Sequence, residues 1–484
     1  MAESRAETTG GGNIATEIPS KNLAPVEYTD LPEPLPMKRV LGPSVLLLAG
    51  AIGSGEYVLW PYITSQVGLA LVWLVIVGVG TQYFLNMEIT RYTLATGETA
   101  VTGFTRLWKP WGALFIVMTI VPWAWPGWAT GGTTTLAFAF GFSQDLVPYA
   151  TIGVLVLIGA ILTLAPVVYR TVEKIQFFLV GLIVLFLIYT AFVLLGADGW
   201  VELGKGFVAV GDIPGAISDV PAATLLGAIA FAGAGGALNL VQSNWIRDKG
   251  LGMGARMPKV VSPFTGEEQT QATTGFFFPQ DEANLARWRG WWKVADREQF
   301  TTFFVVGAFA LVLLMTLTFV TIGTGSDAES FDFINLVGEG LGGGATTTIF
   351  YLIGTVVLYS TNFAVLDMVG RVTADVMKTG PLRESTRWSE SRIYFVVIWA
   401  EILFGSLILL SGLDQPLVLL IIASSLNGIV MFVYSILLIR LNRGVLPKTI
   451  GLRGGRLVAV AWAVLFYGGF SLFTVYDQVG SLFG

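Results

Sequence analysis

The chain contains a long series of apolar runs of about twenty residues or more, and this feature restricts its fold more than any other. A helix of that length matches the hydrocarbon core of a bilayer, which is roughly 30 Å thick. Only 13% of the residues are charged, whereas a soluble domain carries roughly 25%. The sequence therefore predicts an all-α membrane protein with about eleven transmembrane helices.

Six predicted helices precede a long polar loop, and five follow it. Their approximate ranges are 40–65, 67–91, 112–141, 147–168, 172–196, 222–245, 299–323, 345–370, 391–411, 415–439 and 457–477. Basic residues are retained on the cytoplasmic side, so their distribution tests this map. With a cytoplasmic N-terminus, all but one of the 28 Lys and Arg residues fall on the cytoplasmic side, and the exception is Lys205. We therefore predict a multi-pass protein of the cell membrane with an external C-terminus.

The predicted helices group into two halves of five, with one helix appended. Because each half holds an odd number of spans, the two halves have inverted topology. The chain then divides into a disordered cytoplasmic tail, a first repeat, an external loop, a second repeat with a cytoplasmic loop at 246–297, and a final cytoplasmic loop with helix eleven. These parts cover residues 1–39, 40–196, 197–221, 222–441 and 442–484. The tail is assigned as disordered because it is polar and rich in Gly, Glu, Thr and Pro.

Glycine-rich runs interrupt the first helix of each half. Helix one contains the run Gly53–Glu56, and helix six contains the run Gly233–Asn239. Transporters built from inverted repeats bind substrate where these two helices are broken, although glycine also permits close helix packing. A carboxylate inside the membrane is costly unless it meets a cation, a polar cavity, a proton or a structural partner. The predicted substrate-binding residues are Glu56, Gly53, Ser54, Gly55, Gly233, Gly236 and Asn239.

Four further residues are candidates for the cavity or for a coupling path. Trp125 and Trp128 belong to a run of three tryptophans in helix three, which could face an organic cation or simply pack at the interface. Asp367 and Glu401 lie inside apolar runs and belong either to an ion or proton path or to buried structural pairs. The basic and aromatic run 287–293 suits an anchor at headgroup level or an inner gate.

Several stretches resemble the Nramp (natural resistance-associated macrophage protein) family of metal-ion transporters. They are Leu41–Pro43 with Gly53–Tyr57, Arg91–Gly97, Tyr169–Glu173 and Tyr359–Asn362, between about residue 40 and residue 440. The resemblance implies a LeuT-type fold with ten core helices in a 5+5 inverted repeat. It also implies alternating access and a cation site between helices one and six.

The signature residues of that family differ in this chain. The family's Asp-Pro-Gly-Asn run in helix one corresponds here to Gly53–Glu56, and its Met-Pro-His-Asn run in helix six, aligned on Asn239, has no Met here. Without the thioether ligand, the site favours a hard ion such as Mg²⁺ or Mn²⁺. Glu56 and Asn239 are the expected metal ligands, together with backbone carbonyls. Helix three lacks the acidic residues that serve a proton path in the family.

The sequence therefore predicts a secondary active transporter of a hard divalent cation. One alternative is a transporter of an organic cation or amino acid, with Glu56 as the counter-ion. Another is a non-transporting membrane sensor or scaffold. Membrane lipids and a small cationic substrate are the expected partners, and neither nucleic acid nor a cofactor is expected. An enzyme is not predicted, because the sequence has neither His nor Cys and matches no phosphate-binding loop.

Overall fold

The structure is a computed structural model that describes residues 18–165, 167–261, 274–325 and 331–483. Within these residues, ten helical segments are long and apolar enough to cross a membrane. They are Pro43–Val67, Val72–Thr96, Pro110–Phe140, Gln144–Leu164, Val168–Leu194, Glu282–Ile322, Gly344–Thr379, Glu390–Leu410, Pro416–Gly444 and Gly455–Asp477. The remaining predicted span, helix six, consists of two helices that are each too short to cross alone.

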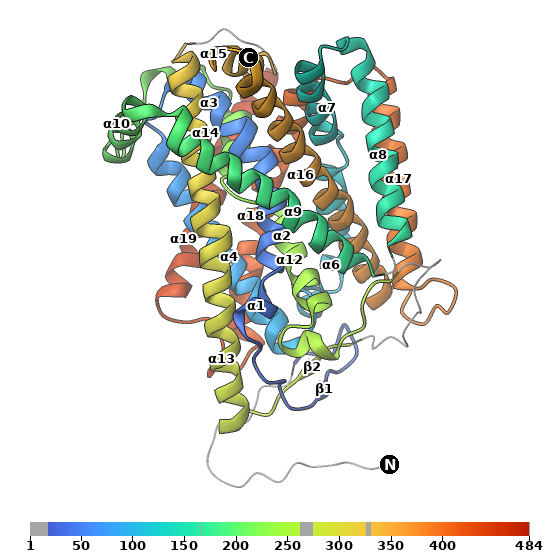
Figure 1. The fold of residues 1–484 in the computed structure, drawn as a ribbon. Helices are drawn as coiled ribbons and strands as arrows, with labels where there is room; N and C mark the ends of the chain where they lie inside the picture. Colours follow the sequence, from blue (N-terminus) through green and yellow to red (C-terminus); the bar gives the residue numbers. More distant parts are fainter. Residues whose placement is uncertain (1–17, 166, 262–273, 326–330, 484) are drawn as a thin grey trace, which may run out of the picture.

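The first described element of the first half is a short strand, and all the elements that follow it there are helices (Figure 1). Its elements are β1 (Glu27–Tyr28), α1 (Met37–Val40), α2 (Pro43–Ala51), η1 (Ile52–Leu59), α3 (Trp60–Val67), α4 (Val72–Thr96), α5 (Ala100–Leu107), α6 (Pro110–Trp123), α7 (Gly127–Phe140), η2 (Gln144–Leu146), α8 (Val147–Leu164), α9 (Val168–Tyr189), η3 (Thr190–Leu194), α10 (Gly196–Val208) and η4 (Gly215–Asp219).

The second half repeats this order of long and short helices. Its elements are α11 (Ala222–Ala230), α12 (Gly236–Lys249), η5 (Gly252–Arg256), β2 (Phe276–Phe277), α13 (Glu282–Gln299), η6 (Phe300–Val306), α14 (Gly307–Ile322), α15 (Asp332–Gly340), α16 (Gly344–Thr379), α17 (Glu390–Leu410), α18 (Pro416–Gly444) and α19 (Gly455–Phe483). A short helix follows the second long helix in each half, namely α5 and α15. Figure 1 shows α15 at the top, and we call that end the upper end and the end with β1 and β2 the lower end.

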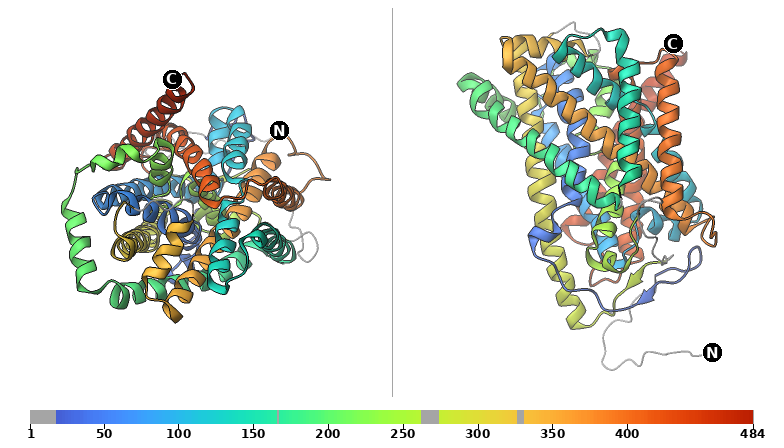
Figure 2. Two further views of the ribbon diagram at one scale, coloured as in Figure 1. Left: turned by 90° about the horizontal axis from the view of Figure 1, so that it is seen from above. Right: turned by 45° about the vertical axis from the view of Figure 1, so that its right-hand side comes forward.

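Helix one, formed by α2, η1 and α3, lies in the centre of the bundle. Its apolar window is fully buried by protein, whereas only a third of the window in α8 is buried. Seen from above in Figure 2, the other helices surround it, and the segment around α10 runs along the outer edge. The predicted external loop 197–221 therefore contains two helices, α10 and η4. Polar residues in helix one are thus shielded from lipid, which a membrane site requires.

Helix seven begins much earlier than predicted. It runs without interruption through α13, η6 and α14, and the side chain of Asp281 caps its start by accepting the N–H of Asn284 at 2.8 Å. The predicted loop 246–297 is therefore shorter at both ends. The basic run 287–293 lies on α13, where Trp288 and Trp291 are buried against protein. These two rings serve packing and are not placed as a free membrane anchor.

Part of the predicted disordered tail is ordered at the lower end. Strand β1 pairs in parallel with β2, so residues 27 and 28 join the segment between helices six and seven. The side chain of Asn22 donates to the carbonyl of Arg106 at 2.9 Å, and Arg106 donates to the carbonyl of Pro19 at 2.8 Å. The prediction was wrong for residues 18–39, and residues 1–17 lie outside the described part of the chain.

Candidate substrate site between helices one and six

Helix six is interrupted between Ala230, the last residue of α11, and Gly236, the first residue of α12. Gly233, Gly235 and Gly236 have φ angles of 123°, 76° and 49°, which side chains disfavour. A Cβ atom on Gly236 would also lie 1.7 Å from Oδ1 of Asn427. The glycines are therefore required for the break itself, in addition to any role in close packing.

Gln82 of α4 holds the backbone of this break. Its Nε2 donates to the carbonyls of Ala230 at 2.7 Å and Ala232 at 3.0 Å. Its Oε1 accepts from the N–H of Gly235 at 3.1 Å and from Nδ2 of Asn239 at 3.2 Å. Backbone groups that leave a helix inside a membrane need such partners. Gln82 therefore makes the interruption stable in a buried position.

Asn427 of α18 supports the same break from another side. Its Oδ1 accepts from the N–H of Ala237 at 3.3 Å and from Nε1 of Trp123 at 2.7 Å. Neither Asn427 nor Gln82 was predicted from the sequence. The signal was present, because each is a carboxamide inside an apolar run, where an unpartnered amide is costly.

Helix one stays helical at its glycines. Its segment η1 is a π-helix, a wide turn that often marks functional sites. The N–H of Gly53 donates to Oγ1 of Thr361 at 3.0 Å. A Cβ atom on Gly55 would lie 1.5 Å from the carbonyl oxygen of Phe231, so helix one touches the start of the break in helix six. The predicted break in helix one is thus a widened turn, and its glycines permit close approach.

Glu56 occupies this widened turn and is fully buried, with 0% of its surface exposed. Neither carboxylate oxygen has a hydrogen-bond partner among the described residues. An isolated charge is very costly in such a place. The carboxyl group therefore requires a proton or a cation that comes from outside the described chain. The side chain of the neighbouring candidate, Ser54, lies outside the described part of the structure.

Helices one and six lie side by side at this level. Besides the contact of helix one with the break, a Cβ atom on Gly50 would lie 2.8 Å from the side chain of Leu238. The side chain of Asn239, one residue further on, donates through Nδ2 to the Oε1 of Gln82 that also accepts from the N–H of Gly235 in the break. Oδ1 of Asn239 has no partner among the described residues.

Aromatic rings gather at the level of Glu56. The rings of Trp123 and Trp128, on either side of an interruption in helix three, stack at 4.9 Å, and the ring of Phe231 lies 5.5 Å and 6.2 Å from them. Trp125 does not join this cluster. Its ring packs on Phe404 of α17 at 6.3 Å. Of the two predicted tryptophans, Trp128 therefore belongs to this aromatic cluster, together with Trp123.

The two other predicted carboxylates lie elsewhere. Asp367 forms an ion pair with Arg371 at 2.8 Å and accepts from Nε1 of Trp245 at 2.9 Å and from the hydroxyl of Tyr394 at 2.6 Å. It is therefore the structural member of a buried pair. Glu401 lies on α17, which packs against α8 and α16 at the periphery.

Buried ion pairs close the lower end below the site. Arg247 of α12 pairs with Asp375 of α16 and, at 2.6 Å, with Glu390 of α17. Lys249 pairs with Glu173 of α9. Among the described residues, no group of three acidic side chains could hold a metal ion by itself. Any ion at Glu56 would therefore complete its coordination with backbone oxygens, water or both.

No family model matches the sequence, and no curated protein matches it. Among solved structures, the chain is similar to a manganese transporter from Eremococcus coleocola, with 13% identity, a TM-score of 0.66, and coverage of 96% of this chain and 92% of that one. It is also similar to Mhp1, a nucleobase-cation-symport-1 family transporter, with 14% identity, a TM-score of 0.51 and coverage of 94% and 96%. For MhsT, in complex with L-phenylalanine, these values are 14%, 0.52, 90% and 98%.

These likenesses show the fold. The chain has the all-α, LeuT-type architecture that the sequence predicts, and the Nramp-like resemblance is confirmed at the level of fold. The similarity extends over nearly the whole chain, so the comparison applies to the fold as a whole.

Proposed function

We propose that this protein is a secondary active transporter that moves a cation across the membrane by alternating access. The observation that carries the proposal is the buried, unpartnered carboxylate of Glu56 beside the break in helix six. In transporters with inverted repeats, substrates bind at such breaks near the middle of the bilayer. A cation that enters from solution supplies the charge partner that Glu56 lacks.

A hard divalent ion, Mg²⁺ or Mn²⁺, is the first candidate for the substrate. The chain has no cysteine, and the run Gly233–Asn239 in helix six contains no methionine, so oxygen ligands, which suit hard ions, are the ones this run supplies. The ion contacts the carboxylate of Glu56 directly and keeps part of its water shell, because no group of three acidic side chains is present among the described residues. Mg²⁺ in particular gives up its water reluctantly. The manganese transporter from Eremococcus coleocola shares this fold, which supports the same class of substrate.

An organic cation is the second candidate, and the aromatic cluster favours it. Trp123, Trp128 and Phe231 lie at the level of Glu56, and the faces of such rings attract cations. A quaternary amine would place its charge near the carboxylate and its alkyl groups on the rings.

Uptake by purified protein in proteoliposomes tests the function and separates the two substrates. We expect flux of Mn²⁺ or Mg²⁺, and loss of that flux in Glu56→Gln, which keeps the shape of the side chain and removes its charge. Glu339→Gln is the matched control, because it neutralises an exposed carboxylate on α15. Flux of a quaternary amine alone would select the second substrate. Folded protein with no flux of any tested cation would overturn the proposal and favour the sensor or scaffold.

We also propose that the lower end faces the cytoplasm, because the predicted cytoplasmic charges gather there and Lys205 lies on α10. The chain has no cysteine, so single cysteines report accessibility without background. In intact cells, an impermeant thiol reagent should label Asp212→Cys in the upper loop and leave Thr386→Cys in the lower loop unlabelled. Labelling in the reverse pattern would invert the orientation.

A further inference from the structure

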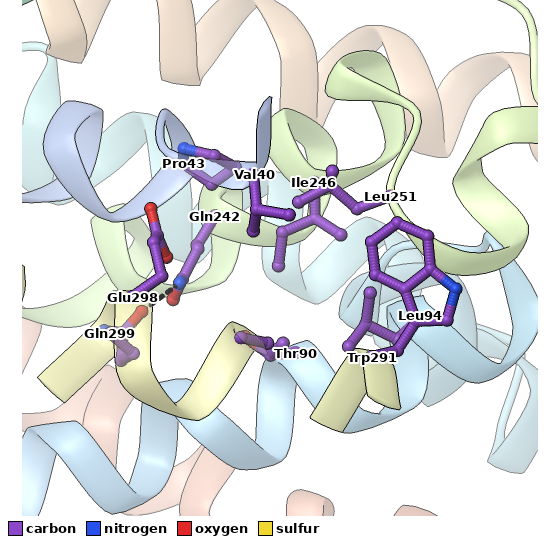
Figure 3. A pocket seen from close by; sticks show the side chains of 11 residues that line it. Val40, Pro43, Thr90, Leu94, Gln242, Ile246, Leu251, Trp291, Glu298 and Gln299 are labelled. Atoms are coloured by element: carbon purple, nitrogen blue, oxygen red, sulfur yellow. Dashed lines mark hydrogen bonds between the residues drawn. The ribbon is translucent and has the colours of Figure 1, made fainter. Parts of the chain in front are cut away.

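A small cavity lies at the lower end, beside the start of helix one and below Glu56. Its volume is about 10 Å³, which is room for one water-sized species. Figure 3 shows its polar lining, which consists of Glu298 and Gln299 at the end of α13, Gln242 of α12 and Thr90 of α4. Helices α4, α12 and α13, which come from both repeats, therefore meet at this cavity beside the start of helix one.

Three polar atoms of the lining have no partner among the described residues. They are Oγ1 of Thr90, Oε1 of Gln242 and Nε2 of Gln299, and each of these residues is at most 4% exposed. A buried polar atom without a partner is costly, and native structures resolve such cases with ordered water or a ligand. The cavity and the unpartnered atoms are two separate observations that indicate an occupant.

The chemistry of the two glutamines identifies this occupant as water. Nε2 of Gln242 donates to Oε1 of Gln299 at 2.5 Å, which leaves one acceptor and one donor free. If both amides are turned over, the roles exchange and one acceptor and one donor are again free. A bare metal ion cannot accept a hydrogen bond from the free amide. A water molecule can accept from one amide, donate to the other and reach Thr90.

Glu298 borders the same cavity and holds the foot of helix one. Its carboxylate accepts from the N–H of Gly42 at 3.3 Å and of Ser44 at 3.1 Å, and from the hydroxyl of Ser44. Helix α2 begins at Pro43, so Glu298 caps the positive end of that helix from α13. It has no ion pair among the described residues. One buried carboxylate thus closes helix one against helix seven.

The charged groups on the elements around Glu298 have partners of their own or reach solvent. Lys249 pairs with Glu173, Glu88 pairs with Arg91, and Asp296 pairs with Arg456. The hydroxyl of Tyr169 on α9 donates to Glu173. Three further charged residues pair with partners in the lower network, namely Arg247, Asp248 and Arg371. The side chains of Lys38, Arg39 and Arg297 are exposed. Glu298 is therefore the carboxylate at this position that neutral donors alone satisfy.

We propose that Glu298 and the water in this cavity form a proton-binding site that couples transport to protons. A proton passes from hydronium at the lower end, through the cavity water, to a carboxylate oxygen of Glu298, where an O–H bond forms and the negative charge is lost. The bonds to Gly42 and Ser44 weaken, since hydrogen bonds to a charged acceptor are stronger than those to a neutral one. The foot of helix one is then free to move. The chain has no histidine for this task.

This inference rests on the proposed transport function, and two assays in the same vesicles keep the two apart. Counterflow exchanges labelled for unlabelled substrate without a net gradient, while accumulation is driven by an imposed proton gradient. In Glu298→Gln we expect accumulation to fall at least about tenfold while counterflow remains. Glu282→Gln, an exposed neutralisation at the start of α13, should keep both. Accumulation in Glu298→Gln at the wild-type level would overturn the inference, whereas wild-type protein without either flux would overturn transport itself.

A second variant decides the matter if Glu298→Gln is inactive in both assays. Ser44→Ala removes one donor to the charged carboxylate and leaves Glu298 in place. We expect the pH dependence of accumulation to move to higher pH, because the charged form has lost a stabilising bond. An unchanged pH profile would contradict the assignment of Glu298. Thr90→Val should remove the ordered water. Hydrogen exchange of the backbone amides around the cavity at the same rate in this variant and in the wild type would argue against the water.

Discussion

Glu56 and Asp367 are both fully buried carboxylates in the middle of apolar helices, yet their surroundings are opposite. Asp367 has an arginine, an indole N–H and a phenol as partners. Glu56 has none among the described residues. In sequence the two positions look alike, as single acids within hydrophobic runs. The difference shows that partners, more than burial, separate a structural carboxylate from one that is held ready for a ligand.

The largest effect on stability is expected from substitution of Asp367, the carboxylate that has partners. Asp367→Asn removes one of the two charge partners of the buried Arg371, and removal of one member of a buried ion pair costs about 3–5 kcal/mol. We expect that loss in the free energy of unfolding, measured by thermal or denaturant unfolding in detergent. A variant as stable as the wild type would show that Asp248, the other partner of Arg371, is sufficient.

A smaller loss should follow when an uncharged but fully bonded group is removed. Gln82→Leu leaves the carbonyls of Ala230 and Ala232 and the N–H of Gly235 without their side-chain partner. We expect a loss of about 1–3 kcal/mol in unfolding free energy, the usual cost of an unsatisfied buried group. Gln415→Leu, at an exposed turn, is the control and should change stability by at most about 0.5 kcal/mol. Equal losses in both variants would contradict the role of Gln82.

Glu56→Gln should change stability much less than Asp367→Asn, because no described partner loses a bond. We expect a change within about 1 kcal/mol, in the direction of higher stability, since the cost of burying a charge disappears. The same unfolding assay with added Mn²⁺ sharpens the contrast. Ligand at a hundredfold excess over its dissociation constant raises wild-type stability by about 2.7 kcal/mol, and Glu56→Gln should lose this gain. A ligand effect of equal size in both proteins would place the cation elsewhere.

The smallest effect is expected at Trp125, which faces away from the site. Trp125→Leu should change neither cation affinity nor stability by more than about 0.5 kcal/mol. Trp128→Leu, in the stacked pair, should weaken the binding of an organic cation by about 0.5–2 kcal/mol if such a cation is the substrate. Titration calorimetry on both variants compares the two rings. A larger loss at Trp125 would reverse their assignment.

The sequence predicted the spans well because hydropathy and charge bias are local properties that add up along the chain. It also predicted the glycine run that interrupts helix six, and helix one touches the start of that break at Gly55. It did not predict that Gly53–Glu56 lies in a π-helix, or that Gln82 and Asn427 support the break. Both features depend on which helices are neighbours.

The ordered segment was missed for a related reason. Residues 18–39 carry few apolar side chains, and composition alone assigns such a segment to disorder. Its order comes from partners on other helices. Leu31 is buried and its N–H donates to Oδ1 of Asn284 at 2.9 Å, while Trp291 donates to the carbonyl of Pro32 at 2.8 Å.

This segment has a mechanical consequence, because it is fastened to both repeats. Asn22 is bonded to α5 of the first repeat, and Pro32 to α13 of the second. The ten residue-to-residue steps from Asn22 to Pro32 reach roughly 35 Å when fully extended. These residues form a tether of limited length across the lower end. Rocking of one repeat against the other must therefore either straighten this segment or break the hydrogen bonds at one of its ends. A bulky fusion attached near residue 18 would restrict the movement of this tether. It would alter the rate at which the transporter opens without touching any residue of the substrate site.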